Sequence, residues 1–201
     1  MRFLAIDFET NGLTSDSVLP CGAFPTQVSV TAYDPELDEI THLYDSYIHG
    51  AGSLSRWVLE NTQVRLDLLY HAPPPELVSA ELAALWQEGD LVVAHNTKFD
   101  LETVLPKITS PDHPLLWCRR VCTMKQRWCT GMDSPRLLHL CRELRVPYAI
   151  NDAHSAVYDS LAVAKCVQVA HRKGLQLGVQ RFVGKTGWLD PLRWTHLVPK
   201  A

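Results

Sequence analysis

The chain has 201 residues, the usual size of one domain, and 46% of them are hydrophobic against 20% charged. This balance excludes a disordered, collagen-like or coiled-coil chain, and no apolar run approaches the roughly 20 residues that span a bilayer. The formal net charge of −3 is unevenly divided along the chain. Residues 1–116 carry 5 basic and 17 acidic side chains. Residues 117–145 carry 7 basic and 2 acidic side chains, and residues 172–201 carry 6 basic and 1 acidic. Such a chain could hold cations on one side and a polyanion on the other, or the charges could simply be solvated.

Hydrophobic periodicity and turn residues predict five strands and five helices. The strands are expected at residues 2–9, 27–33, 40–48, 91–94 and 115–123, and the helices at residues 53–60, 76–88, 97–107, 134–144 and 155–172. Thr97 is the expected N-cap of the third helix, Pro135 the first residue of the fourth, and Gly174 closes the last. This order predicts an α/β fold, a mixed sheet with helices on its faces and antiparallel pairing among the first three strands.

The cysteines and the N-terminus bear on the compartment. Six cysteines are spread along the chain, which favours small reduced thiols over a disulfide framework. A structural zinc at Cys118, Cys122 and Cys129 is the less favoured alternative, because no second pair of ligands matches them. An acid already stands at position 7, without a signal-peptide or transit pattern, so a cytoplasmic or other reducing compartment is expected.

Asp7 and Glu9 lie two residues apart at the end of the first strand, so both point to the same face. Phe3 and Ala5 occupy that face further back. The two acids therefore mark the point where a buried face opens, at the end of a strand where ligands usually bind. Acids at a strand end often only meet water, but the apolar residues behind this pair weaken that alternative.

Asp159 is expected on the buried side of the last helix. At about 100° per residue, Ala156, Ala162 and Val163 all fall within about 60° of it. A carboxylate in such an apolar stripe is costly unless it is paired or bound to a cation. Lys165 points away from Asp159, so a metal ion is the economical partner.

Two further residues could join this site. Asp100 either closes a capping box with Thr97 or, because it shares a face with Val104, points inward. His154 stands five residues before Asp159, and on one helix the two would lie about 140° apart. To serve the same site, His154 must lie on the loop ahead of the helix, where an imidazole could act as a base near neutral pH.

Clustered carboxylates need cations. Two of them about 4 Å apart repel by roughly 4 kcal/mol at an effective dielectric constant of about 20. Hard oxygen ligands suit Mg²⁺ or Mn²⁺ better than zinc. Two such ions about 3.5–4 Å apart form the arrangement that cleaves phosphodiesters.

These residues stand in the order of a known family. Asp7-Phe8-Glu9-Thr10 with Gly12-Leu13, then residues 94–100 (AHNTKFD) and residues 154–159 (HSAVYD), resemble the three motifs of the DEDDh 3′→5′ exonucleases. That family includes the proofreading subunits of bacterial replicative DNA polymerases, oligoribonuclease and ribonuclease T-like enzymes. The likeness covers residues 1–172 and implies an RNase H-like fold, a mixed five-stranded sheet with helices on both faces, and two Mg²⁺ or Mn²⁺ ions per site.

The family's pattern also implies roles for the site residues. Asp7, Glu9 and Asp159 would hold one ion. Asp7 would bridge to the second ion, Asp100 would assist it through water, and His154 would act as the base.

Further positions match the part of the family's site that meets the substrate. Thr10 and Leu13 match positions that contact the 3′-terminal nucleotide, and Asn96 and Phe99 match positions that shape the floor of the pocket. The chain departs from many relatives in a longer loop at residues 15–24 and in its tail, which leaves recognition of the substrate end and the partners open.

The resemblance implies a metal-dependent 3′→5′ exonuclease that releases nucleoside 5′-monophosphates from single-stranded ends, DNA more than RNA. The alternatives are an exoribonuclease that trims RNA or clears oligonucleotides, and a non-catalytic module that binds nucleic acid or a polymerase. Residues 1–174 would form the exonuclease domain. Residues 175–201 would pack on it, extend a nucleic-acid groove or dock a DNA polymerase, and no membrane partner is expected.

Basic and aromatic residues are the expected grip on a single strand. In the chain's middle they are Trp117, Arg119, Arg120, Lys125, Arg127 and Trp128. In the tail, Arg181, Lys185, Trp188, Arg193 and Trp194 could extend that groove, dock a polymerase or simply pack on the domain.

Overall fold

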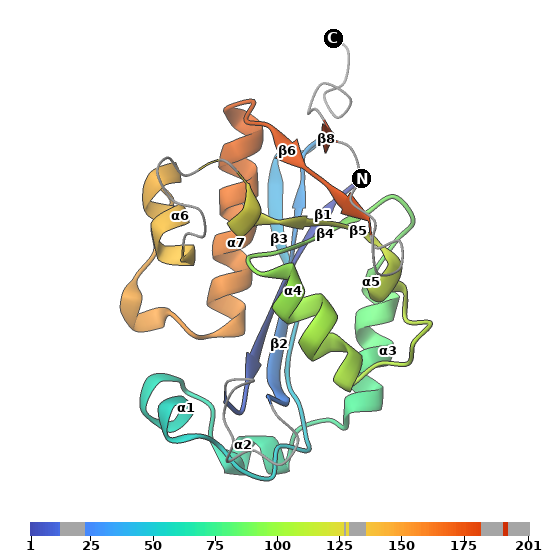
Figure 1. Cartoon of the computed structure of the whole chain (residues 1–201), viewed down its shortest axis with the longest axis vertical. Coiled ribbons are helices and arrows are strands. Elements are labelled where there is room, and N and C mark those ends of the chain that lie inside the picture. Colours follow the sequence, from blue (N-terminus) through green and yellow to red (C-terminus); the bar gives the residue numbers. More distant parts are fainter. Residues whose placement is uncertain (13–22, 127, 129–135, 182–190, 193–201) are drawn as a thin grey trace.

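A computed structural model describes residues 1–12, 23–126, 128, 136–181 and 191–192. Its main sheet has the strand order β3-β2-β1-β4-β5-β7 (Figure 1). The strands are β1 (Phe3–Thr10), β2 (Pro25–Asp34), β3 (Glu39–Tyr47), β4 (Leu91–Ala94), β5 (Arg119–Cys122) and β7 (Gln180–Arg181). A second, two-stranded sheet pairs β6 (Leu177–Gly178) with β8 (Pro191–Leu192).

The pairing makes the main sheet mixed, as predicted. β1 pairs antiparallel with β2 and parallel with β4, while β2 with β3 is antiparallel and β4 with β5 is parallel. The five predicted strands are all present, and the two-residue strand β7 extends the sheet antiparallel to β5. β1 lies inside the main sheet, between β2 and β4, so residues that follow either neighbouring strand can lie close to its end.

Helices cover both faces of the sheet (Figure 1). They are α1 (Arg56–Asn61), α2 (Leu66–Tyr70), α3 (Pro75–Leu85), α4 (Thr97–Phe99), α5 (Pro114–Trp117), α6 (Leu137–Leu144) and α7 (Ala156–Arg172). Shorter turns of other helix types are η1 (Asp100–Val104, π), η2 (Leu105–Lys107), η3 (Thr123–Lys125) and η4 (Ile150–Asp152), the last three 3₁₀. The structure places α6 and α7 on one face and α3, α4 and α5 on the other.

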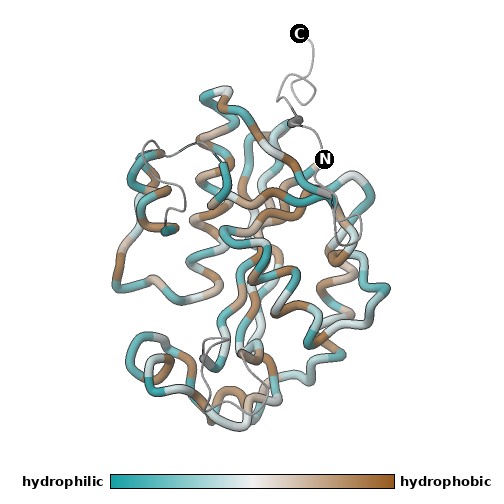
Figure 2. Tube along the Cα trace, in the orientation of Figure 1, coloured by the Kyte–Doolittle hydropathy of each residue, from teal (hydrophilic) through white to brown (hydrophobic). Residues whose placement is uncertain are grey.

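The alternation along β1 divides the core into two layers. Phe3 and Ala5 pack with α6 and α7, whereas Leu4, Ile6 and Phe8 pack with the helices of the opposite face. Figure 2 shows hydrophobic stretches concentrated along the central strands and hydrophilic residues in many of the outer loops. By the same alternation, the acids at positions 7 and 9 lie on the α7 side of the sheet.

Some local expectations are wrong. Asn96, not Thr97, is the N-cap residue of α4, because Asn96 has non-helical backbone angles (φ −130°, ψ 81°) and Thr97 is already helical. The expected helix at residues 97–107 changes to a π turn at Asp100 and then to a 3₁₀ turn. Pro114 begins a short helix where the expected strand at residues 115–123 should start, so that strand is confined to β5.

Two helix ends were also predicted. α6 begins at Leu137 after an extended Arg136, and Pro135 lies outside the described residues. Gly174 follows α7 with a φ of 62°, and its backbone N–H donates to the carbonyl of His171 at 2.9 Å. Gly174 therefore ends the last helix, as predicted.

Residues of the expected tail that the structure describes pack on the same body. Leu177 and Val179 are buried in the core beneath α6 and α7. Cys118, Cys122, Cys141 and Cys166 are buried, and none of these four forms a disulfide. In the part of the chain that the structure describes, no helix has both the length and the hydrophobicity to cross a membrane.

Candidate active site

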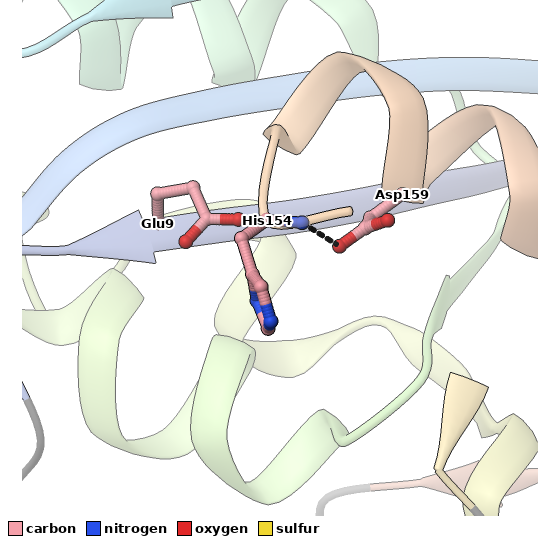
Figure 3. A group of neighbouring side chains, drawn as sticks. All are labelled: Glu9, His154 and Asp159. Atoms are coloured by element: carbon pink, nitrogen blue, oxygen red, sulfur yellow. Dashed lines mark hydrogen bonds between the residues drawn. The ribbon is translucent and has the colours of Figure 1, made fainter. Parts of the chain in front are cut away.

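Carboxylates from three distant segments meet at the end of β1. Asp7 and Glu9 come from the strand itself. Asp100 lies beside them, because its Oδ1 accepts a hydrogen bond from the backbone N–H of Phe8 at 3.2 Å. One ligand atom each of Glu9, His154 and Asp159 lies within 4.8 Å of the others (Figure 3). The fold therefore gathers the acids of all three motifs in one place.

Asp159 enters the site from the first turn of α7. It is only 8% exposed, in agreement with its expected place on the buried side of the helix. Its Oδ1 accepts a hydrogen bond from the Tyr148 hydroxyl at 2.6 Å, and its Oδ2 accepts one from the backbone N–H of His154 at 3.3 Å. α7 packs closely on β2 through hydroxyl groups, since Ser160 Oγ lies 2.9 Å from Ser29 Oγ.

Asp100 points inward, at the junction where α4 passes into its π turn. The capping-box interpretation that takes Thr97 as the cap is wrong, because Asn96 is the N-cap residue. Burial raises the pKa of Asp100, and the hydrogen bond from the backbone N–H of Phe8 offsets part of that rise. π turns inside helices are frequent at functional sites, since they re-aim one side chain.

Burial and mutual repulsion disturb the titration of these acids. Burial raises the pKa of Asp100 to about 7. Burial and the neighbouring carboxylates of Asp159 and Asp100 raise the pKa of Glu9 to about 8. Burial, followed by repulsion from Asp100, Asp159 and Glu9, raises the pKa of Asp7 well above its usual range. The cluster therefore needs positive charge to be fully ionised at neutral pH.

His154 lies where the sequence requires it for a shared site, just ahead of α7. Its side chain is exposed, and its backbone has a φ of 62°, a left-handed conformation that is uncommon outside glycine. Its ring meets the Trp57 ring of α1 edge-on, with the centroids 4.9 Å apart and the planes at 81°. The imidazole thus stands at the solvent side of the acid cluster, against a large aromatic ring.

A cavity of about 470 Å³ opens beside the acids. It is lined by Asp7, His95, Asn96, Met124, Arg136, Leu137, Leu138, Tyr148, Ile150, Ala153, His154 and Asp159. Its volume lies in the range of small-molecule sites. Arg136 is the one lysine or arginine among the described residues of this lining, so an acidic end and a guanidinium face the same cavity.

The other predicted substrate residues differ in their placement. Asn96 lines the cavity, whereas Phe99 packs partly buried against the core beneath α3. The Thr10 hydroxyl donates to the carbonyl of Gly12 at 2.8 Å and is buried. Leu13 lies outside the described residues.

The prediction that basic and aromatic residues of the middle segment bind a single strand is wrong for two of these residues. Arg120 is buried, and its Nη2 donates to the carbonyl of Leu116 at 2.5 Å. Trp128 is buried as well, and its Nε1 donates to the carbonyl of Gln176 at 2.7 Å. Both side chains therefore point into the fold and not to the surface, where a nucleic acid could bind. Arg119 and Lys125 are exposed, and Arg127 lies outside the described residues.

Three residues of the site escaped the sequence analysis. Tyr148 lies in the irregular segment between α6 and the 3₁₀ turn η4, and Arg136 is the N-cap residue of α6, so no periodicity marks either side chain. His95 lies within the second motif, and this position could have indicated a role at the site. In the structure its Nδ1 lies 3.0 Å from Thr123 Oγ1.

The donor set fits a divalent cation. Carboxylate oxygens are the ligands that Mg²⁺ and Mn²⁺ prefer. Asp7 and Glu9 both have raised pKa values because negative charge is crowded and buried, which is the condition that a bound cation relieves. Glu9 and Asp159 each have a carboxylate oxygen, and His154 a ring nitrogen, within 4.8 Å of one another.

The chain is similar to known proteins in sequence and in fold. No family model matches the chain. It is 23% identical over 184 residues to DNA polymerase III PolC-type of Bacillus subtilis (strain 168), an alignment that covers 87% of this chain but only 12% of that protein. The chain thus spans a small part of this curated relative.

Solved structures share the fold. One is a 3′-exonuclease that recognises the 3′ end of the histone mRNA stem-loop, with a TM-score of 0.72, 14% identity and coverage of 95% of this chain and 96% of that one. Another is the nuclease domain of 3′hExo, a DEDDh family member, bound to rAMP, with a TM-score of 0.71, 14% identity and coverage of 90% and 97%. The chain therefore has the fold of these 3′-exonucleases, which confirms the predicted RNase H-like architecture, and it resembles a DEDDh family member at the level of the fold.

Proposed function

We propose that this protein is a metal-dependent 3′→5′ exonuclease that hydrolyses phosphodiester bonds at single-stranded 3′ ends and releases nucleoside 5′-monophosphates. One observation carries the proposal: Asp7, Glu9, Asp100 and Asp159 converge from three segments at the end of β1, with His154 beside them. The family resemblance supports the same reaction.

Each residue has a role in this proposal. Asp7, Glu9 and Asp159 would hold one Mg²⁺ or Mn²⁺ ion, Asp7 would also serve a second, and Asp100 would assist through water. When bound, the two ions supply the positive charge that stabilises the transition state of phosphodiester cleavage. The exposed imidazole of His154 accepts the proton of the attacking water, which is the task of a general base.

The cavity beside the acids is the proposed place of the terminal nucleotide. Asn96 contributes to its lining, and the Arg136 guanidinium stands where it can meet a phosphate. A single strand is the proposed substrate, because its end can enter such a cavity without first being unpaired from a complement.

DNA is the proposed nucleic acid, and the curated relative supports it, since that protein is a DNA polymerase. The same likeness supports a DNA polymerase as a partner. RNA is the second candidate, because one solved neighbour recognises the histone mRNA stem-loop and the other holds rAMP.

Digestion of labelled oligonucleotides tests the proposal. With Mg²⁺, the wild type should shorten 5′-labelled single-stranded DNA stepwise, and Asp7→Asn should be slower by a factor of at least ~100, since losing ~3 kcal/mol of charge stabilisation has that effect. Asp67→Asn, an exposed acid on α2, is the matched control and should retain full activity. Equal activity of the wild type and Asp7→Asn would refute the assignment.

Four substrates separate the candidates: single-stranded DNA, duplex DNA, matched RNA and dinucleotides. A strong preference for RNA or dinucleotides would replace the DNA assignment by an exoribonuclease. Tight binding of every strand without turnover in Mn²⁺ would instead favour a non-catalytic module that binds nucleic acid.

A further inference from the structure

The Tyr148 side chain contacts the buried Asp159 carboxylate directly. The phenol donates to Oδ1 at 2.6 Å, while the backbone N–H of His154 donates to Oδ2 at 3.3 Å. Donors on both oxygens fix the rotation of the carboxylate plane, and each oxygen keeps a further lone pair. A phenol stays protonated at neutral pH, so it remains a donor whether or not a cation is bound.

Tyr148 is itself fixed in place from two sides. α6 ends with Arg145 in a left-handed conformation, and the backbone N–H of Val146 then donates to the carbonyl of Cys141 at 2.7 Å. On the other side, the Tyr148 and Tyr158 rings lie 5.1 Å apart, and the Tyr158 hydroxyl accepts a hydrogen bond from the next backbone N–H, that of Ala149, at 2.5 Å. The phenol oxygen therefore has a position set by α6 and α7.

From this geometry we infer that Tyr148 is a positioning residue for the divalent cation of the proposed site. It acts through Asp159, whose carboxylate it holds in the orientation that places an oxygen within 4.8 Å of one from Glu9. The inference rests on the proposed function only in requiring that this site binds a cation. Groups that orient a metal ligand typically change the affinity for the metal by roughly 10–100-fold, which gives the size of the expected effect.

The test measures Mn²⁺ binding by the full chain without substrate. Calorimetric titration of Mn²⁺ into wild type and Tyr148→Phe should give a dissociation constant at least ~10-fold weaker for the variant. The substitution removes one oxygen atom and leaves the packed ring. Tyr158→Phe is the comparison variant, because it removes the hydroxyl that accepts from Ala149 but keeps the hydrogen bond from Tyr148 to Asp159, so its Mn²⁺ affinity should fall clearly less than that of Tyr148→Phe.

The outcomes separate this inference from the proposed function. Equal Mn²⁺ affinity of wild type and Tyr148→Phe, both folded by near-ultraviolet circular dichroism, would overturn it. An equal loss in Tyr148→Phe and Tyr158→Phe would also overturn it, because packing of the segment would then explain the effect. If the wild type binds Mn²⁺ but degrades no oligonucleotide, the proposed exonuclease activity is refuted. Weaker Mn²⁺ binding by Tyr148→Phe would in that case still support the positioning role.

Discussion

Asn11 fastens the end of β1 to two other segments. Its side-chain Oδ1 accepts the backbone N–H of Phe24 at 2.7 Å, and its Nδ2 donates to the carbonyl of Ser53 at 3.2 Å. Its own backbone N–H donates to the carbonyl of Phe24 at 2.9 Å, and its carbonyl accepts a hydrogen bond from the backbone N–H of Ser55 at 2.8 Å. One residue, only 5% exposed, thus joins β1, β2 and the segment that leads to α1. α1 in turn carries Trp57 against His154.

Replacing this side chain should loosen the acidic end of the sheet. In Asn11→Ala, the backbone N–H of Phe24 and the carbonyl of Ser53 lose their partners, so the free energy of unfolding should fall by ~1–3 kcal/mol. Urea unfolding measures it. Asn61→Ala removes the same amide at an exposed position of α1 and should cost less than ~0.5 kcal/mol. Equal losses in the two variants would contradict the role of Asn11.

Single residues differ in how far the sequence could predict them. Asp159 could be placed because helical geometry alone puts it in an apolar stripe, and the structure buries it. Asp100 had two interpretations, because a capping role and an inward role use the same residue type. Tyr148 and Trp57 could not be found, since they reach the site only through the tertiary packing of short segments that have no repeating pattern.

At the scale of elements, α7 determines where the site can form. Small side chains line its contact with the sheet, among them Ala156, Ala162 and Ala170, all nearly inaccessible to solvent. Ser160 reaches β2 through Ser29 and Thr31, with oxygen–oxygen distances of 2.9 and 3.1 Å. This close packing brings the first turn of α7, and with it the third motif, to the end of β1.

A larger residue in this contact should therefore damage both stability and metal binding. Ala162→Leu overfills the core, which should lower the free energy of unfolding by ~1–3 kcal/mol. It should also weaken Mn²⁺ binding, because Asp159 lies one turn away. Urea unfolding and calorimetry measure the two effects. Lys165→Leu places the same side chain at a half-buried position of α7 and should leave the stability and the Mn²⁺ affinity near those of wild type. If the two variants lost equal stability and equal Mn²⁺ affinity, the packing role of Ala162 would be contradicted.

Elements with a strong pattern were predictable and weakly patterned ones were not. β1, β2, β4 and α7 carry apolar runs or helical periodicity over much of their length, and they lie within a few residues of the predicted positions. α2 has five residues and the strands β6, β7 and β8 have two each, too few for a period to show. The π turn at Asp100 has no sequence signal, because it depends on where the carboxylate is held.

At the scale of the whole molecule, the buried acids tie the stability of the fold to pH. Glu9 and Asp100 have pKa values of about 8 and about 7 in the folded chain. In an unfolded chain, such groups release their protons near pH 4. Between these limits the folded state binds more protons than the unfolded state, so the free energy of unfolding falls as pH rises. His113 and His171 add the opposite slope near pH 6, because burial lowers their pKa values.

The metal-free protein should therefore lose stability between about pH 5 and about pH 8, and Mn²⁺ should restore it most at the upper end, where the carboxylates are ionised and bind the cation best. Urea unfolding across this range, with a chelator and with Mn²⁺, measures both effects. Glu9→Gln isolates the contribution of the acids from that of the histidines, because it removes one titrating carboxylate from the cluster and leaves every histidine in place. The variant should have a flatter dependence of stability on pH without metal, and it should gain less from Mn²⁺ at about pH 8. A wild type and a Glu9→Gln variant with the same slope would show that the crowded carboxylates do not govern the stability of the fold.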